Sequence, residues 1–190
     1  MSDPRGVQIA LPSWVDEVVD WNRPYPDARD KVRLVIGLAR ENVLRDTGGP
    51  FGAAVFERDT GRLVSVGTNS VTRLQSSTLH AEIVALLLAQ RRLESYTLRM
   101  PGRPEDEIAT SCDPCAMCLG AVLGSGVRRL VAAASRDDAA RIGFEEGPVF
   151  PESFRYLEER GIEVVRGILR EEAREVFDLY RERGGEIYNG

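Results

Sequence analysis

The chain has 190 residues, 43% of them hydrophobic, which is enough to build the core of one globular domain. Acidic residues outnumber basic residues, 30 to 25, and the formal net charge of −5 disfavours a protein that binds by neutralising many phosphates. The first six residues lack the apolar stretch of a secretory signal, and the longest apolar run, 83–89, is far shorter than the ~20 residues that cross a bilayer. We therefore expect a cytoplasmic protein with no membrane partner.

The first 26 residues are rich in proline and show no sustained periodicity, so we expect an irregular arm over 1–26 and a single domain over 27–190. Apolar residues at helical spacing predict helices at 28–44, 81–93, 116–123, 138–142 and 170–183. Short β-prone runs predict strands at 53–56, 63–66, 108–111, 129–133 and 162–165, the first two joined as a hairpin. This alternation predicts a three-layer α/β/α fold around a central mixed sheet of about five strands, mostly parallel in its second half.

The residues suited to metal chemistry are clustered in two short segments. The one histidine of the chain stands in His80-Ala81-Glu82, directly before an apolar helix, and all three cysteines lie between 112 and 118. His-x-Glu followed by Pro114-Cys115-Ala116-Met117-Cys118 matches, in order, the signature of zinc deaminases that act on bases. Each segment alone would be weak evidence, whereas the two together are specific.

The spacing of these residues suits a catalytic zinc site. Pro114 fits the beginning of a helix, which places Cys115 and Cys118 three residues apart on one face. Two thiolates and a neutral imidazole balance the charge of Zn²⁺, and three protein ligands leave the fourth tetrahedral position open for water. His80 is then expected at the mouth of its helix, with Glu82 in the first turn, where it can take a proton from that water.

Other interpretations of these residues stay open from the sequence. A thioredoxin-like redox pair would explain Cys115 and Cys118 but not His80-Ala81-Glu82. A non-catalytic module with a closed Cys₃His site would use Cys112 as the fourth ligand, although a cysteine that ends a β-prone run is more typical of a buried core residue. Glu82 could also be a solvated carboxylate at the start of a helix.

From about Gly49 to the C-terminus, the chain resembles the cytidine deaminase-like superfamily and, within it, the bacterial guanine deaminase branch. The resemblance rests on five segments: Gly49-Pro50-Phe51-Gly52-Ala53, Gly67-Thr68-Asn69, His80-Ala81-Glu82, the segment from Cys112 to Cys118, and the segment from Asp138 to Glu146. The last of these is the most specific to the branch. The chain departs from the branch at Asp113, where glutamate is common, and in its arm, which is longer than in the smallest relatives.

The resemblance implies one catalytic Zn²⁺ per subunit, with a bound water or hydroxide, held by His80, Cys115 and Cys118. It implies that Glu82 is the proton shuttle and that Asp138 and Glu146 are candidates for a second one. Residues that would contact the base are Asn69, Ala81, Phe51, His80 and Tyr188. The last lies in a C-terminal segment that would cap the pocket of the neighbouring subunit in a homodimer, an arrangement in which this segment is swapped between subunits.

Several of these residues have a plainer interpretation. Asn69 also suits a turn at the end of a strand, and Phe51 also suits an ordinary core position. Asp138 and Glu146 are also typical of helix-cap and surface carboxylates in an acidic protein.

The resulting hypothesis is hydrolysis of guanine to xanthine and ammonia. Deamination of cytosine or of an aminotriazine such as ammeline would use the same metal centre with other pocket walls. Editing of adenosine in tRNA is a further alternative, but the negative charge and the absence of an Lys/Arg-rich run disfavour a nucleic-acid partner.

Overall fold

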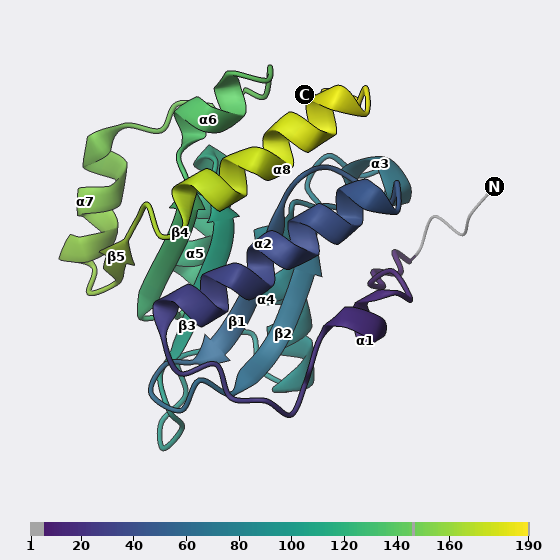
Figure 1. Ribbon diagram of the computed structural model, residues 1–190. Coiled ribbons are helices and arrows are strands. Elements are labelled where there is room, and N and C mark those ends of the chain that lie inside the picture. The colour runs from purple at the N-terminus through teal and green to yellow at the C-terminus, as the bar shows by residue number, and fades with distance from the viewer. Residues whose placement is uncertain (1–5, 146, 190) are drawn as a thin grey trace.

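The computed structural model describes residues 6–145 and 147–189, which are built around a mixed five-stranded sheet (Figure 1). The strand order is β2-β1-β3-β4-β5, with bounds Leu63–Thr68, Gly52–Glu57, Asp106–Cys112, Arg129–Ala134 and Glu163–Val165. Strand β1 runs antiparallel to β2 and β3, whereas β3, β4 and β5 run parallel. The five strands confirm the predicted sheet, including the hairpin and the parallel second half.

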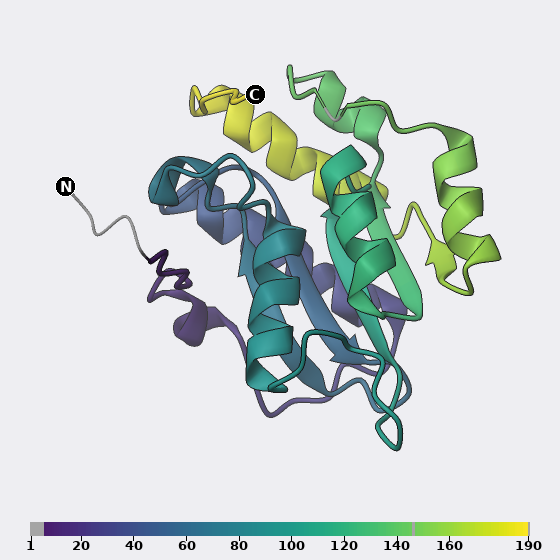
Figure 2. The same ribbon diagram turned by 180° about the vertical axis from the view of Figure 1, so that it is seen from behind.

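Helices cover both faces of the sheet and complete the predicted three layers. Helices α2 (Ala28–Leu44) and α8 (Arg170–Glu182) lie over one face, and α4 (Ala81–Arg92) and α5 (Ala116–Ser125) lie over the other (Figures 1 and 2). Alternate residues of β1 enter two separate cores, because successive strand side chains point to opposite faces. Ala54 and Phe56 pack beneath α2 and α8, whereas Ala53 and Val55 pack beneath α4 and α5.

Two strand glycines let the helices lie close to the hairpin. A Cβ atom on Gly52 would lie 2.3 Å from the carbonyl oxygen of Val35 in α2. A Cβ atom on Gly67 would lie 2.1 Å from the carbonyl oxygen of Ala81 at the start of α4. Because such contacts are too short for a carbon atom, these glycines set how deeply the two helices sit on the sheet.

The shorter helices were predicted less well than the long ones, because the spacing of apolar residues gives little information over so few residues. Helix α6 (Arg136–Ala140) begins two residues before the predicted 138–142, where the side chain of Ser135 caps its first turn. Helices α1 (Val15–Val18), α3 (Val71–Leu74) and α7 (Pro151–Glu159) were not predicted. The first two have a single turn, and α7 buries only Phe154 and Leu157. Such helices show too few apolar repeats to be recognised.

The N-terminal arm takes part in the core. Trp14, Val15, Val19 and Tyr25 are buried in the same cluster as the inner faces of α2 and α8. The arm is therefore a packed part of the structure from Trp14 onward, although α1 is its one helix among the described residues. No helix in the described ranges combines the length and the apolar content that would let it cross a membrane.

Candidate active site

The predicted metal ligands lie at the N-termini of two neighbouring helices. His80 is the N-cap residue of α4, with an extended backbone (φ −64°, ψ 159°), and Glu82 lies in the first helical turn. Cys115 is the N-cap residue of α5, and its Sγ accepts a hydrogen bond from the backbone N–H of Cys118 at 3.4 Å. The sulfur thus occupies the position of a conventional capping oxygen, and both helix dipoles favour negative charge at the site.

His80, Cys115 and Cys118 form a compact group of possible metal ligands. Their ligand atoms all lie within 4.8 Å of one another. The Nδ1 atom of His80 is 3.5 Å from the Sγ atom of Cys115 and 3.7 Å from that of Cys118. Two sulfurs and one imidazole nitrogen around a common point are the donor set that zinc prefers, so the residues fit this metal.

The two thiols are coupled. A hydrogen bond from Cys118 lowers the pKa of Cys115 to about 4, against the opposing effect of burial, and His80 lowers it further. The same hydrogen bond, together with burial, raises the pKa of Cys118. The lowered pKa of Cys115 favours the thiolate, which is the form of cysteine that binds zinc.

Glu82 is the carboxyl group of this centre. Its side chain is buried and interacts with the Cys118 thiol. Burial raises the pKa of Glu82 to about 7, and the negative charge of Cys115 acts in the same direction. The alternative of a solvated carboxylate at the start of a helix does not hold, because only 8% of the residue is exposed.

Cys112 lies apart from the metal-ligand group. It ends β3 and is buried in the core beneath α2 and α8, with its Sγ 3.5 Å from the carbonyl oxygen of Ser135. The possible metal ligands found among the described residues are His80, Cys115 and Cys118, without Cys112. The geometry therefore favours an open three-ligand site over a closed Cys₃His site.

The segments predicted to contact the base lie side by side at the start of β1 and the end of β2. Asn69 directly follows β2 and is 1% exposed; its Nδ2 has no hydrogen-bond partner within the described ranges. Its backbone N–H donates to the carbonyl of Phe51, which joins the two segments. Phe51 contacts both cores, its ring 5.0 Å from that of Phe144. Ala81 is fully buried at the start of α4.

Of the two candidates for a second proton shuttle, Asp138 lies within the described residues and Glu146 lies outside them. Asp138 is 4% exposed and closes a capping box with Ser135 at the start of α6. Its carboxylate also pairs with Arg170 and Arg174 of α8. This arrangement is the helix-cap role that the sequence left open.

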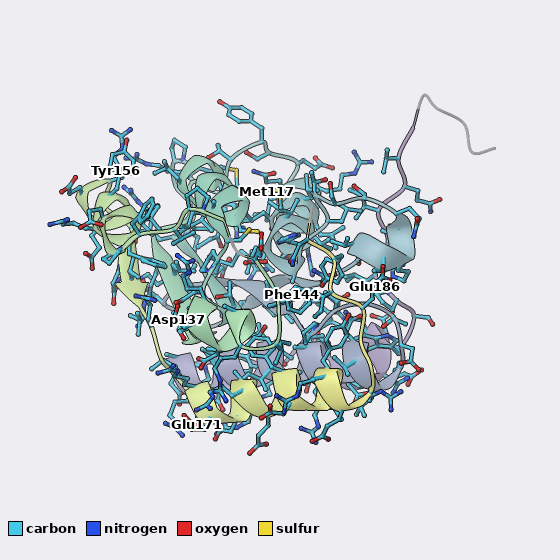
Figure 3. The ribbon with its side chains drawn as sticks, turned by 90° about the horizontal axis from the view of Figure 1, so that it is seen from above. Met117, Asp137, Phe144, Tyr156, Glu171 and Glu186 are labelled. Atoms are coloured by element: carbon cyan, nitrogen blue, oxygen red, sulfur yellow. The ribbon has the colours of Figure 1, made fainter. Side chains whose placement is uncertain are left out.

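The C-terminal segment lies on its own chain. Beyond Glu186 it turns back across the end of the sheet (Figure 3), and the Tyr188 ring is 5.1 Å from the ring of Phe144. Asn189 donates to the carbonyl of Gly143 and accepts from the N–H of Glu145. Tyr188 also lies against Gly49, where a Cβ atom would be 1.8 Å from its hydroxyl oxygen. In a single chain, this segment thus closes over the segments that carry Phe51 and Phe144.

Two supporting groups were not predicted from the sequence. Asn42 is fully buried in α2, and its Nδ2 donates to the carbonyls of Gly49 and Asn69 at 2.9 Å each. Asp113, directly before Pro114, is paired with Arg166. The sequence did contain a signal for Asn42, which is a polar residue at a core-facing position of the 28–44 helix. No local pattern in the sequence connects Asp113 with Arg166.

The class of the protein follows from the comparison of its sequence with protein families. Residues 27–134 match the cytidine and deoxycytidylate deaminase zinc-binding region, and this match spans more than half of the chain. The chain therefore belongs to this family of deaminases, as the paired His-x-Glu and Pro-Cys-x-x-Cys segments predicted.

Individual proteins are similar to this chain over most of its length. The solved structure of guanine deaminase from Nitrosomonas europaea superimposes with a TM-score of 0.90 at 42% identity, covering 96% of this chain and 100% of that chain. Guanine deaminase of Bacillus subtilis is 35% identical over 131 residues, which are 69% of this chain and 80% of that protein. A tRNA-specific adenosine deaminase of Buchnera aphidicola is 30% identical over 153 residues, which are 80% of this chain and 93% of that protein.

Proposed function

We propose that this chain hydrolyses guanine to xanthine and ammonia. The observation that carries the proposal is the group formed by His80, Cys115 and Cys118 beside the buried Glu82 carboxyl. This group supports the hydrolytic chemistry. The choice of guanine is supported by the likeness to two guanine deaminases, one of them over almost the whole chain.

The three ligands would hold one zinc ion per subunit. Zinc bound there would supply Lewis-acid activation of the hydrolytic water. Glu82 would take a proton from the hydrolytic water as the water oxygen bonds to the carbon that carries the amine, and would deliver that proton to the adjacent ring nitrogen. Because Glu82 is buried beside the ligands, it can move the proton without passing it through bulk water.

Asn69 and its neighbours would hold the base. The buried Nδ2 group of Asn69 lacks a partner among the described residues and suits an acceptor on the purine. Ala81 would orient the base through its backbone, and Phe51, His80 and Tyr188 would line the ring. For the second proton transfer we propose Glu146, because Asp138 is occupied by Ser135, Arg170 and Arg174.

The proposal is tested by measuring ammonia release from guanine, cytosine, adenine, ammeline and guanosine in parallel. We expect guanine to turn over fastest. Glu82→Gln should lower kcat by about 10²- to 10⁴-fold while zinc stays bound, because it removes the proton shuttle and leaves the ligands intact. Glu94→Gln is the matched control, since Glu94 is an exposed residue just beyond the other end of α4.

Two results would count against the proposal in different ways. Faster turnover of cytosine or ammeline than of guanine would keep the metal chemistry but replace the substrate. Near-normal turnover by a folded, zinc-loaded Glu82→Gln protein would contradict the mechanism. The homodimer, the swapped C-terminal segment and the cytoplasmic location stay predictions from the sequence.

A further inference from the structure

We infer that the N-terminal arm positions Asn69, and thereby sets the affinity for the base, through a buried hydrogen-bonded relay. The relay consists of Trp14, Thr47 and Asn42, and it ends on the backbone of Gly49 and Asn69. This inference rests on the proposed function, because it takes Asn69 as a residue that contacts the base.

The relay begins at a fixed point of the arm. Trp14 is 4% exposed and packs in the core beneath α2 and α8. Its indole Nε1 donates a hydrogen bond of 3.0 Å to the hydroxyl oxygen of Thr47. An indole N–H can only donate, so the direction of this first bond is certain.

The direction of the first bond fixes the second. Since the Thr47 oxygen accepts from Trp14, its hydroxyl hydrogen is available to the Oδ1 atom of Asn42, 2.7 Å away. Oδ1 can only accept, and this contact determines which way the amide of Asn42 is turned. The NH₂ group of Asn42 therefore faces the opposite direction, away from Thr47.

On that side, Asn42 uses both hydrogens. Its Nδ2 lies 2.9 Å from the carbonyl oxygen of Gly49 and 2.9 Å from that of Asn69. Gly48 leaves the space for this approach, because a Cβ atom there would lie 2.1 Å from the Asn69 oxygen and 2.8 Å from Nδ2. One side chain thus joins the segment that leads to Phe51 with the residue proposed to hold the base.

A second contact from the arm reaches the same place. Arg73 in α3 donates to the carbonyl of Ala10 at 2.7 Å and to the hydroxyl of Ser70 at 2.9 Å. Ser70 is fully buried and directly follows Asn69. The arm therefore holds the Asn69 backbone from both sides, through Asn42 and through Ser70.

The zinc ligands are independent of the relay. His80, Cys115 and Cys118 stand at the starts of α4 and α5, and none of the bonds in the relay involves them. Loosening the relay should therefore weaken the binding of the base and leave metal binding unchanged. Trp14, Thr47 and Asn42 are positioning residues, since they act through Asn69.

The test removes single hydrogen bonds from the zinc-loaded full-length protein. Trp14→Phe deletes the indole donor and keeps an aromatic ring, and Thr47→Val deletes the hydroxyl at nearly constant volume. Trp21→Phe is the matched control, because Trp21 is also in the arm but donates to Asp16, outside the relay. We expect KM for guanine to rise about three- to tenfold in both relay variants, with kcat and zinc content close to wild type.

A purely structural role would not reproduce the next two results. In ¹⁵N-labelled protein, the side-chain amide signals of Asn69, assigned by their loss in Asn69→Ala, should shift in Trp14→Phe and not in Trp21→Phe. In the Asn69→Ala background, Trp14→Phe should cause no further rise in KM, because the relay acts through the side chain that is already missing.

The outcomes separate the two proposals. If Trp14→Phe and Thr47→Val match Trp21→Phe in KM and in the Asn69 signals, the role of the arm is wrong, whatever the substrate. If the two effects on KM add in the double variant, the arm acts elsewhere and the inference is also wrong. If Asn69→Ala itself leaves KM unchanged, the base contact assigned under the proposed function fails, and this inference fails with it.

Discussion

At the scale of single residues, Asp113 shows how the turn before the metal ligands is fixed. Asp113 is 3% exposed and accepts hydrogen bonds from the guanidinium of Arg166, including one of 2.8 Å from Nε. Its carboxylate also accepts from the backbone N–H of Arg136. The Arg166 guanidinium in turn lies 4.0 Å from the centre of the Phe154 ring. Since Pro114 and Cys115 follow directly, these contacts hold the start of α5 in place.

We therefore expect Asp113→Asn to weaken zinc binding by up to about 10- to 100-fold, the range for losing a group bonded directly to a metal ligand, because Asp113 acts on Cys115 through the backbone. Competition with a chromophoric chelator would measure this affinity without any use of activity. Asp113→Glu keeps the carboxylate and should retain most of the affinity. Asp178→Asn, which breaks an exposed pair with Arg181, is the control. Equal zinc affinity in Asp113→Asn and Asp178→Asn would refute the role of Asp113.

Residues of this kind also mark the limit of sequence-based prediction. His80, Glu82, Cys115 and Cys118 were predicted because His-x-Glu and Pro-Cys-x-x-Cys, each within one short segment, together match the signature of zinc deaminases. Asn42 was missed because its partners, Gly49 and Asn69, become neighbours only when the hairpin and α2 pack together. Tertiary contacts of this type leave no periodic signal in the chain.

At the scale of elements, Asp138 links two helices. It lies in the first turn of α6, where Ser135 and the helix N-terminus stabilise its charge, and it pairs with Arg170 and Arg174 of α8. Burial raises the pKa of Asp138, but hydrogen bonds from Arg170 and Ser135 outweigh burial and lower it to about 2. A carboxylate that stays ionised in this way is suited to joining α6 with α8 rather than to exchanging protons near neutral pH.

The lowered pKa predicts how stability depends on pH. A carboxylate with a lower pKa in the folded state stabilises the protein above its unfolded-state pKa, and this contribution is lost as pH falls through the folded-state value. Asp138→Asn should therefore lower the free energy of unfolding by about 2 kcal/mol at pH 7, with the difference shrinking between about pH 4 and pH 2. Urea unfolding at several pH values measures it. Asp137→Asn in the same turn is the control; a pH-independent difference for Asp138→Asn would contradict the prediction.

Elements were predictable where the sequence repeats a pattern often enough. The helix at 28–44 has the bounds of α2, because Asp27 caps its first turn through the N–H of Asp30 and an apolar stripe runs its whole length. By contrast, α7 was not predicted, because it begins at Pro151 and ends shortly before Gly161, and a segment between a proline and a glycine is equally typical of a loop. The arm was expected to be irregular, and the burial of Trp14 depends on the surface that α2 offers it.

At the scale of the whole molecule, α4 and α5 form the layer over the second face of the sheet (Figure 2), and part of the outer surface of this layer is apolar. Helix α5 contains no charged residue, and Met117 on α5 and Leu87 on α4 are exposed. A second copy of the chain would cover such a face, in line with the predicted homodimer. Sedimentation equilibrium should show a dimer that the Leu87→Lys, Met117→Lys double variant dissociates. Tyr96→Lys, at a residue that is 91% exposed, should remain dimeric; a wild-type monomer would overturn the prediction.

The charge of the molecule disfavours tRNA as a substrate relative to a small base. The net charge is −5, and several basic groups at the end of the sheet opposite the candidate site are paired within the molecule: Arg58, Arg128 and Arg129 pair with Glu105, Glu107 and Glu163. Binding to tRNA needs unpaired cations that displace counterions and therefore falls steeply with salt, whereas a neutral base carries no such dependence.

We therefore expect kcat/KM for guanine to change little as salt is raised, and no gel shift of tRNA at about 0.15 M salt. An uncharged base is not attracted to the protein by long-range electrostatic forces, so screening of those forces by salt has little effect on its binding. The likeness to a tRNA-specific adenosine deaminase, 30% identical over 153 residues, makes binding to tRNA a useful test of this prediction. Tight, salt-sensitive binding of tRNA, together with conversion of its adenosine, would replace guanine with a macromolecular substrate.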